Sequence, residues 1–92
     1  MSGEPFSYDE ARRRIRRIPA TGTTAWTRHA LGEMAKDGMS QVDAVSVLRA
    51  GLVRSWDLVT GTYRYRVETR KFCVVVAFRD DDQLVVVTAW RF

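Results

Sequence analysis

The chain has 92 residues and a formal net charge of +4, with 46% hydrophobic and 28% charged residues. This length predicts a single domain over residues 1–92, and this composition can bury a core and excludes an intrinsically disordered chain. The apolar runs are far shorter than the roughly 20 residues of a membrane span, and the first residues lack the pattern of a signal peptide, so we expect a cytoplasmic protein without membrane contact.

The first predicted element is an amphipathic, basic helix over residues 7–18. Ser7 and Glu10 have the spacing of a capping box, and Pro19 is expected to end the helix. Apolar residues recur at helical spacing, at Tyr8, Ala11, Ile15 and Ile18. Arginines gather on the opposite side, at Arg12, Arg13, Arg16 and Arg17. This basic face is either solvated or a binding face for RNA or a partner. Residues 21–24 are predicted to be a connector.

Two short helices are predicted next. Residues 28–36 form the first, with an inward face made of Ala30, Leu31, Met34 and Ala35. Gly38 has the position of a left-handed cap, Ser40 opens the following helix, and Gly51 is expected to end that helix in the same way. The pair has helix-turn-helix spacing, but the second helix holds only Arg49 as a cation and makes a poor recognition helix.

After Gly51 the hydrophobic period changes from helical to two, which predicts strands over residues 52–58, 63–68, 72–78 and 84–87. In the second of these, Tyr63, Tyr65 and Val67 alternate with Arg64, Arg66 and Glu68, so one face is aromatic and the other ionic. The last two strands are apolar on both faces, which is typical of central strands. The order predicts an α+β fold, with the helices on one face of an antiparallel meander.

The cations favour a nucleic-acid partner. Thirteen of the fifteen are arginines, whose planar fork binds phosphate and stacks on bases, although a GC-rich genome also replaces lysine with arginine. Arg64 and Arg66 alternate on one strand, so their side chains would point the same way about 7 Å apart, near the phosphate repeat of an extended single strand. The alternative is that they form cross-strand salt bridges on a solvated face.

His29 is the one residue whose ordinary pKa suits acid or base catalysis near neutral pH. Together with Tyr65, Arg64, Arg66 and Lys71 it would be a sufficient set for metal-independent cleavage of RNA. The alternative is a histidine that caps its helix. We interpret Cys73 as a packing residue and residues 80–82 as a solvated turn. One cysteine and one histidine exclude an internal disulfide and a zinc cluster, so no metal and no cofactor are expected.

Four segments, residues 27–40, 43–51, 63–67 and 86–90, resemble a small bacterial family of uncharacterised domains that is similar in fold pattern to the RelE- and MqsR-type toxins. The resemblance covers about residues 24–91. It implies helices packed on a small curved antiparallel sheet, and an mRNA endonuclease or translation-blocking toxin. It also implies a cognate antitoxin protein of the zinc-finger or helix-turn-helix type.

The family pattern is matched at His29, Arg66, Thr88 and Trp90, whereas Glu33 and Asp37 stand where many members carry arginine. We therefore expect catalysis by His29, Tyr65, Arg66 and Lys71. The expected RNA contacts are Arg28, Arg64, Arg70, Thr88, Trp90 and Arg91. Two other functions stay open: a non-catalytic RNA-binding or regulatory module on the same surface, and a protein-interaction domain for an acidic partner.

Overall fold

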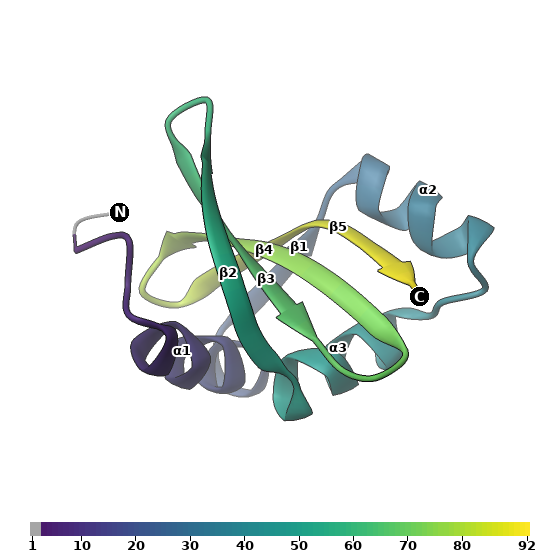
Figure 1. The fold of residues 1–92 in the computed structure, drawn as a ribbon, viewed down its shortest axis with the longest axis horizontal. Helices are drawn as coiled ribbons and strands as arrows, with labels where there is room; N and C mark the ends of the chain where they lie inside the picture. Colours follow the sequence, from purple (N-terminus) through teal and green to yellow (C-terminus); the bar gives the residue numbers. More distant parts are fainter. Residues whose placement is uncertain (1–2) are drawn as a thin grey trace.

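The computed structural model describes residues 3–92, which form three helices and five strands in an α+β fold (Figure 1). In chain order the elements are α1 (Tyr8–Thr21), β1 (Thr23–Trp26), α2 (Arg28–Lys36), α3 (Gln41–Ala50), β2 (Leu52–Val59), β3 (Thr62–Glu68), β4 (Phe72–Asp80) and β5 (Gln83–Arg91). Helices followed by a run of strands are the order that the hydrophobic periods predict. The α+β prediction is therefore confirmed.

The strands form one open, curved sheet in the order β1-β5-β4-β3-β2. The last four pair antiparallel, which is the predicted meander. The connector predicted over residues 21–24 is wrong, because Thr23 begins β1, which pairs parallel to β5 with Thr23 opposite Gln83. The sheet is therefore mixed, and its one parallel pair joins segments from the two ends of the chain.

The core lies between one face of the sheet and the helices. α1 and α3 lie along the lower side of the sheet in Figure 1, and α2 lies beside the end of β5. Tyr65, Val74 and Val86 point into this core from three neighbouring strands. In α2 only Ala30 and Met34 are buried, so the predicted inward positions of Leu31 and Ala35 are wrong. Within residues 3–92, no helix is long and apolar enough to cross a membrane.

One predicted helix end and one predicted cap conformation differ from the structure, although α3 does end before Gly51 as predicted. α1 continues past Pro19 to Thr21, and its end is closed by the Gly22 N–H, which donates to the Ile18 carbonyl at 2.7 Å. Gly38 adopts the expected left-handed conformation, with φ of +64°. Gly51 does not, since its φ is −75°. Gly51 is instead required by space, because a Cβ there would lie 2.6 Å from the Val47 carbonyl oxygen.

This close approach predicts a large cost for Gly51→Ala. The added methyl would also meet Val67 Cγ1 at 2.9 Å, so α3 would have to shift away from β3. We expect the free energy of unfolding to fall by about 1–3 kcal/mol in urea denaturation. Gly32→Ala is the matched control, because its Cβ meets nothing within 4 Å on the exposed side of α2. That change should raise stability by about 0.5–1 kcal/mol, and equal losses for both would contradict the packing argument.

Candidate nucleic-acid interface

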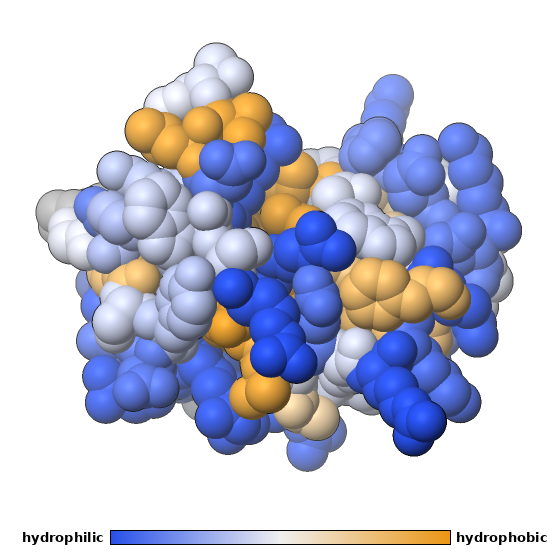
Figure 2. Space-filling view, in the orientation of Figure 1, coloured by the Kyte–Doolittle hydropathy of each residue, from blue (hydrophilic) through white to orange (hydrophobic). Residues whose placement is uncertain are grey.

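The sheet face opposite the core, called here the open face, carries polar and half-buried side chains. Strand alternation places Arg64 and Arg66 on it, because their neighbours Tyr65 and Val67 are buried in the core. Register and alternation assign the other members, which are Ser55, Asp57, Glu68, Cys73, Val75, Ala77, Val85, Thr88 and Trp90. Hydrophilic side chains cross the middle of the molecule between apolar ones in Figure 2. The predicted ionic face of β3 is therefore present.

Arg66 and Trp90 meet on the open face. The guanidinium carbon of Arg66 lies 5.0 Å from the centre of the Trp90 ring, which is a cation–π distance. The same guanidinium forms an ion pair with Glu68 on its own strand. Two residues predicted from the sequence are thus brought together from β3 and β5. A flat cation held over an aromatic ring is a surface on which a base can stack.

Arg64 separates two hollows of this face. One, of about 330 Å³, is lined by Thr27, Thr62, Arg64, Ala77, Phe78, Arg79, Val85 and Val87. The other, of about 250 Å³, is lined by Ser55, Trp56, Asp57, Val59, Arg64, Arg66, Val75 and Trp90. Within residues 3–92, Arg64 forms no salt bridge. Its charge is therefore available to a ligand in either hollow, and the cross-strand salt bridge considered for it is not formed.

Arg79 is a cation of this face that the sequence analysis missed. It is exposed on β4 and lines the first hollow together with Arg64. The signal that could have found it is the period of two, because Arg79 continues the alternate positions of Cys73, Val75 and Ala77.

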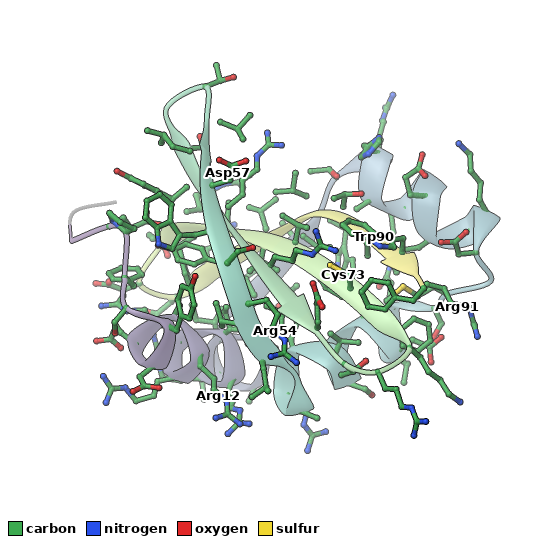
Figure 3. The ribbon with its side chains drawn as sticks, in the orientation of Figure 1. Arg12, Arg54, Asp57, Cys73, Trp90 and Arg91 are labelled. Carbon is green, nitrogen blue, oxygen red and sulfur yellow. The ribbon has the colours of Figure 1, made fainter. Side chains whose placement is uncertain are left out.

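Cys73 lies opposite Trp90 in the register of β4 and β5 (Figure 3), and its thiol is next to the Arg66 guanidinium. Its side chain is fully buried and forms no disulfide. Burial raises the pKa of the Cys73 thiol to about 11, although the neighbouring Arg66 guanidinium lowers it. The thiol therefore stays protonated at neutral pH, as expected for a packing residue.

We expect native Cys73 to resist alkylation. Only the thiolate reacts, and the shift from 9.0 to about 11 leaves about 100-fold less thiolate than a free cysteine has at neutral pH. Iodoacetamide labelling followed by mass spectrometry should therefore be at least about 100-fold slower for the folded protein than for the protein in urea. Equal rates in the two conditions would show that Cys73 is accessible.

Tyr65 faces the core, away from the open face. Its hydroxyl donates to Glu4 Oε2 at 2.8 Å and accepts the Phe6 N–H at 3.0 Å. Burial, together with the hydrogen bond and charge of Glu4, raises the pKa of this phenol above its ordinary value. The structure thus separates Tyr65 from Arg64 and Arg66. Its hydroxyl ties the N-terminal segment to the sheet and is not placed to exchange protons with a ligand on the open face.

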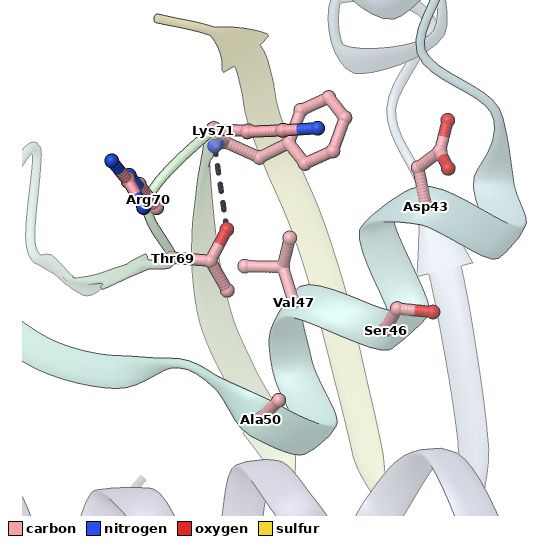
Figure 4. A pocket seen from close by; sticks show the side chains of 8 residues that line it. Asp43, Ser46, Val47, Ala50, Thr69, Arg70 and Lys71 are labelled. Atoms are coloured by element: carbon pink, nitrogen blue, oxygen red, sulfur yellow. Dashed lines mark hydrogen bonds between the residues drawn. The ribbon is translucent and has the colours of Figure 1, made fainter.

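Arg70 and Lys71 lie in the β3–β4 turn and line a different pocket (Figure 4). This pocket, of about 340 Å³, is walled on the other side by α3, with Val47 and Ala50 among its lining residues. It shares no lining residue with the two hollows of the open face. The structure therefore does not bring Lys71 and Arg70 into one site with Arg64 and Arg66.

Arg91 is engaged within the protein. Its guanidinium carbon lies 4.9 Å from the centre of the Phe72 ring. Its backbone N–H donates to Asp37 Oδ2 at 2.9 Å, and its Nε donates to the Asp37 carbonyl at 3.2 Å. Asp37 therefore joins the end of α2 to the end of β5. Arg91 thus has a structural role here, unlike Thr88, which lies on the open face beside Val75.

His29 and Arg28 are exposed in the first turn of α2. The cap residue of this helix, Thr27, accepts the Ala30 N–H at 3.0 Å and donates its hydroxyl to the Val87 carbonyl at 2.9 Å. Thr27 also lines the hollow that holds Arg64 and Arg79. The start of α2 therefore borders the open face, with His29 two residues beyond its rim.

Two arginines of the basic helix α1 form ion pairs with residues outside the helix. Arg14 forms an ion pair with Asp81 at 3.2 Å, and Arg17 forms one with Asp82 at 2.9 Å. These two ion pairs join the acidic turn at residues 80–82 to α1. Among residues 3–92 no group of three or more histidine, cysteine, aspartate or glutamate side chains could hold a metal ion. Of the four arginines on the predicted basic face, Arg13 and Arg17 are ion-paired, with Glu10 and Asp82, which makes the α1 face the weaker candidate for binding RNA.

Comparison with protein families gives one match, and it covers most of this architecture. Residues 26–91 match the model of a domain of unknown function, DUF4258. The matched segment includes α2, α3 and all four strands of the meander, and therefore all members of the open face. Comparisons with curated proteins and with solved structures give no match. The family model spans well over half of the chain, so the protein belongs to the DUF4258 family.

Proposed function

We propose that the protein binds single-stranded RNA on the open face and acts as a toxin-like protein of a bacterial toxin–antitoxin pair. The observation that carries the RNA proposal is Arg64, which lies between two hollows without a salt bridge to any residue of 3–92, beside an Arg66 side chain that covers Trp90. The toxin part rests on the resemblance of residues 24–91 to a family similar to the RelE- and MqsR-type toxins.

The shape of the face favours a single strand over a duplex. Reading a DNA duplex by its major groove needs a projecting helix or a two-stranded ribbon with several polar side chains, and the major groove of an RNA duplex is too deep and narrow for side chains to read. α3 presents one cation, Arg49, and its neighbours on that helix are mostly apolar. A single strand instead needs cations along its backbone and aromatic rings for its bases. Arg64, Arg66 and Trp90 supply these two components on one face.

RNA cleavage is a second candidate, favoured by the position of α2. Thr27 brings the start of this helix to the hollow of Arg64 and Arg79, and His29 is exposed just beyond. A histidine there could take the proton of the 2′-hydroxyl, whose oxygen attacks the phosphorus. The P–O5′ bond then breaks and the leaving oxygen takes a proton from water, while the arginines stabilise the charged phosphorane. Tyr65 and Lys71 are not part of this arrangement, because they lie in the core and in another pocket.

Binding is tested with an end-labelled, unstructured oligoribonucleotide of about 12 nucleotides. Fluorescence anisotropy at increasing salt should give an affinity that falls linearly on a double-logarithmic plot, because each phosphate contact releases counterions. The same sequence as duplex RNA should bind more weakly. Absence of binding at low salt, or tighter binding of the duplex, would contradict the proposal.

Cleavage is tested on the same oligonucleotide in EDTA, with His29→Ala beside the parent protein. Cutting by the parent that His29→Ala abolishes without loss of affinity would identify a metal-independent ribonuclease. Binding without cutting by either protein would leave a non-catalytic RNA-binding module as the function of this face.

A further inference from the structure

One edge of the sheet is open at β1. The Thr23 and Thr27 N–H groups donate to Asp82 and Val86 of the β5 side at 2.8 and 3.1 Å. Because peptide groups alternate along a strand, those of Thr24 and Trp26 point away from β5. No strand of residues 3–92 covers that side of β1. These two residues therefore offer the N–H and C=O groups that an added strand needs.

An apolar groove, called here the β1 groove, lies beside this edge. Its volume is about 420 Å³, and its lining residues are Pro19, Thr24, Trp26, Gln41, Val42, Val45, Ser46 and Arg49. The largest exposed apolar side chain on it is Val42 of α3, which is 75% exposed. The Thr24 hydroxyl is buried without a hydrogen-bond partner in the described chain. An added strand could place alternate side chains in this groove.

The charge of the β1 groove selects the partner. Arg49 is its one charged lining residue, and within residues 3–92 it forms no salt bridge. An acidic side chain on the incoming segment would pair with it, whereas a basic one would be repelled. We propose that the β1 groove binds an extended segment of a partner protein, apolar at alternate positions and carrying an acidic residue opposite Arg49.

The opposite edge of the sheet, β2, is a poorer place for an added strand. Leu52, Trp56 and Leu58 are exposed there, but the register of β2 shifts between Val53 and Ser55. Such a bulge, together with charged side chains on the strand, blocks the pairing of edges. β1 has neither a bulge nor charged side chains, since Thr23–Trp26 pairs regularly with β5 and contains no charged residue.

The β1 groove and the open face use different surfaces. Thr24 and Trp26 lie opposite Leu84 and Val86, which point into the core, so the groove is on the helix side of the sheet. The inference therefore does not depend on RNA binding. RNA and the partner segment should bind the protein together.

The probe is a synthetic peptide of about seven residues, near the length of an average strand. Threonine alternates with valine in it, and one valine position carries glutamate. A control peptide carries lysine at that position. In a heteronuclear NMR titration we expect the glutamate peptide to move the amide signals of Thr24 and Trp26, and the lysine peptide to bind at least about tenfold more weakly.

Two matched pairs of variants test the geometry. Thr24→Pro removes the outward N–H without removing a hydrogen bond to β5, and an edge strand tolerates proline at such a position. It should lower the affinity for the peptide about tenfold or more. Thr24→Val keeps the N–H and should bind as the parent does. Arg49→Glu should reverse the preference between the two peptides, and Arg49→Ala should abolish it. The Arg49 variants keep the proposal testable if Thr24→Pro fails to fold.

Three results of the peptide titrations would overturn the proposal. They are equal binding of the two peptides by the parent protein, unchanged binding by folded Thr24→Pro, and signals that move at β2 instead of β1. Signals of β1 that move with protein concentration in the absence of peptide would also overturn it, because they would identify a second copy of the chain as the occupant.

Discussion

Replacing Arg64 and Arg66 together by alanine is expected to lower the affinity for single-stranded RNA by about 10–100-fold at low salt. Both guanidinium groups lie on the open face, and Arg66 covers the Trp90 ring at 5.0 Å. Each lost phosphate contact should also reduce the salt dependence, by about 0.7 in the slope of log affinity against log salt for a single strand. Fluorescence anisotropy at several salt concentrations measures both effects.

The control is Arg13→Ala with Arg16→Ala, which removes two exposed arginines from α1. The overall charge changes by the same amount, so a loss through net charge would be equal in the two double variants. We expect the α1 variant to bind within about twofold of the parent. An α1 variant that loses as much affinity as the β3 variant would move the interface to the basic helix.

The second large effect is on stability, at Tyr65. Tyr65→Phe keeps the ring in the aromatic cluster with Phe6 and Phe78, whose centroids lie 6.3 and 5.1 Å from that of Tyr65. The substitution leaves the buried Phe6 N–H without a hydrogen-bond acceptor. We expect the free energy of unfolding to fall by about 1–3 kcal/mol in urea denaturation. Tyr63→Phe, on a half-buried residue of the same strand, should change it by less than about 0.5 kcal/mol.

The stability contribution of Tyr65 should also depend on pH. Burial, followed by the bond to Glu4, raises the pKa of the phenol above its ordinary value of 10.0. A raised pKa in the folded state means that the contribution is fully present below about pH 10 and is lost as pH rises above it. The parent should therefore lose more stability than Tyr65→Phe between about pH 9 and 11. Parallel curves for the two proteins would contradict the buried position of the hydroxyl.

Tyr65→Phe also separates two roles for the residue. If the hydroxyl serves only the core, RNA binding and any RNA cleavage should be unchanged at neutral pH, because it lies on the opposite side of the sheet from Arg64. A variant that stays folded yet loses cleavage would return Tyr65 to the catalytic set.

The local elements could be predicted because their signals are local. Residues 28–36 are the helix found, Ser40 caps α3 with its hydroxyl accepting the Asp43 N–H at 3.0 Å, and the alternation over β3 places Tyr65 in the core. β1 could not be predicted, because a four-residue strand has too short a pattern and its partner, β5, is at the far end of the chain. Gly51 shows part of the same limit, since its added Cβ would meet Val67 of β3 as well as the Val47 carbonyl oxygen of the preceding helix.

The candidate site was predicted in part. Alternation on one strand correctly placed Arg64 and Arg66 side by side, and the register of β4 and β5 adds Trp90. The set expected for catalysis is not assembled in the structure, because the β3–β4 turn places Lys71 in another pocket. The short distance in sequence between Arg66 and Lys71 does not show this. Tyr65 is not part of the site either, although it lies between Arg64 and Arg66 in the sequence. Adjacent residues of a strand point to opposite faces, so Tyr65 cannot share a site with both of its arginine neighbours.

The three tryptophans allow a direct measurement of whether the open face binds RNA. Trp90 lies on the open face, Trp26 lines the β1 groove, and Trp56 lies at the edge of the second hollow. When the unstructured oligoribonucleotide is added, we expect the indole N–H signal of Trp90 to move in the NMR spectrum while that of Trp26 stays in place. Movement of the Trp26 signal with an unchanged Trp90 signal would contradict RNA binding on the open face.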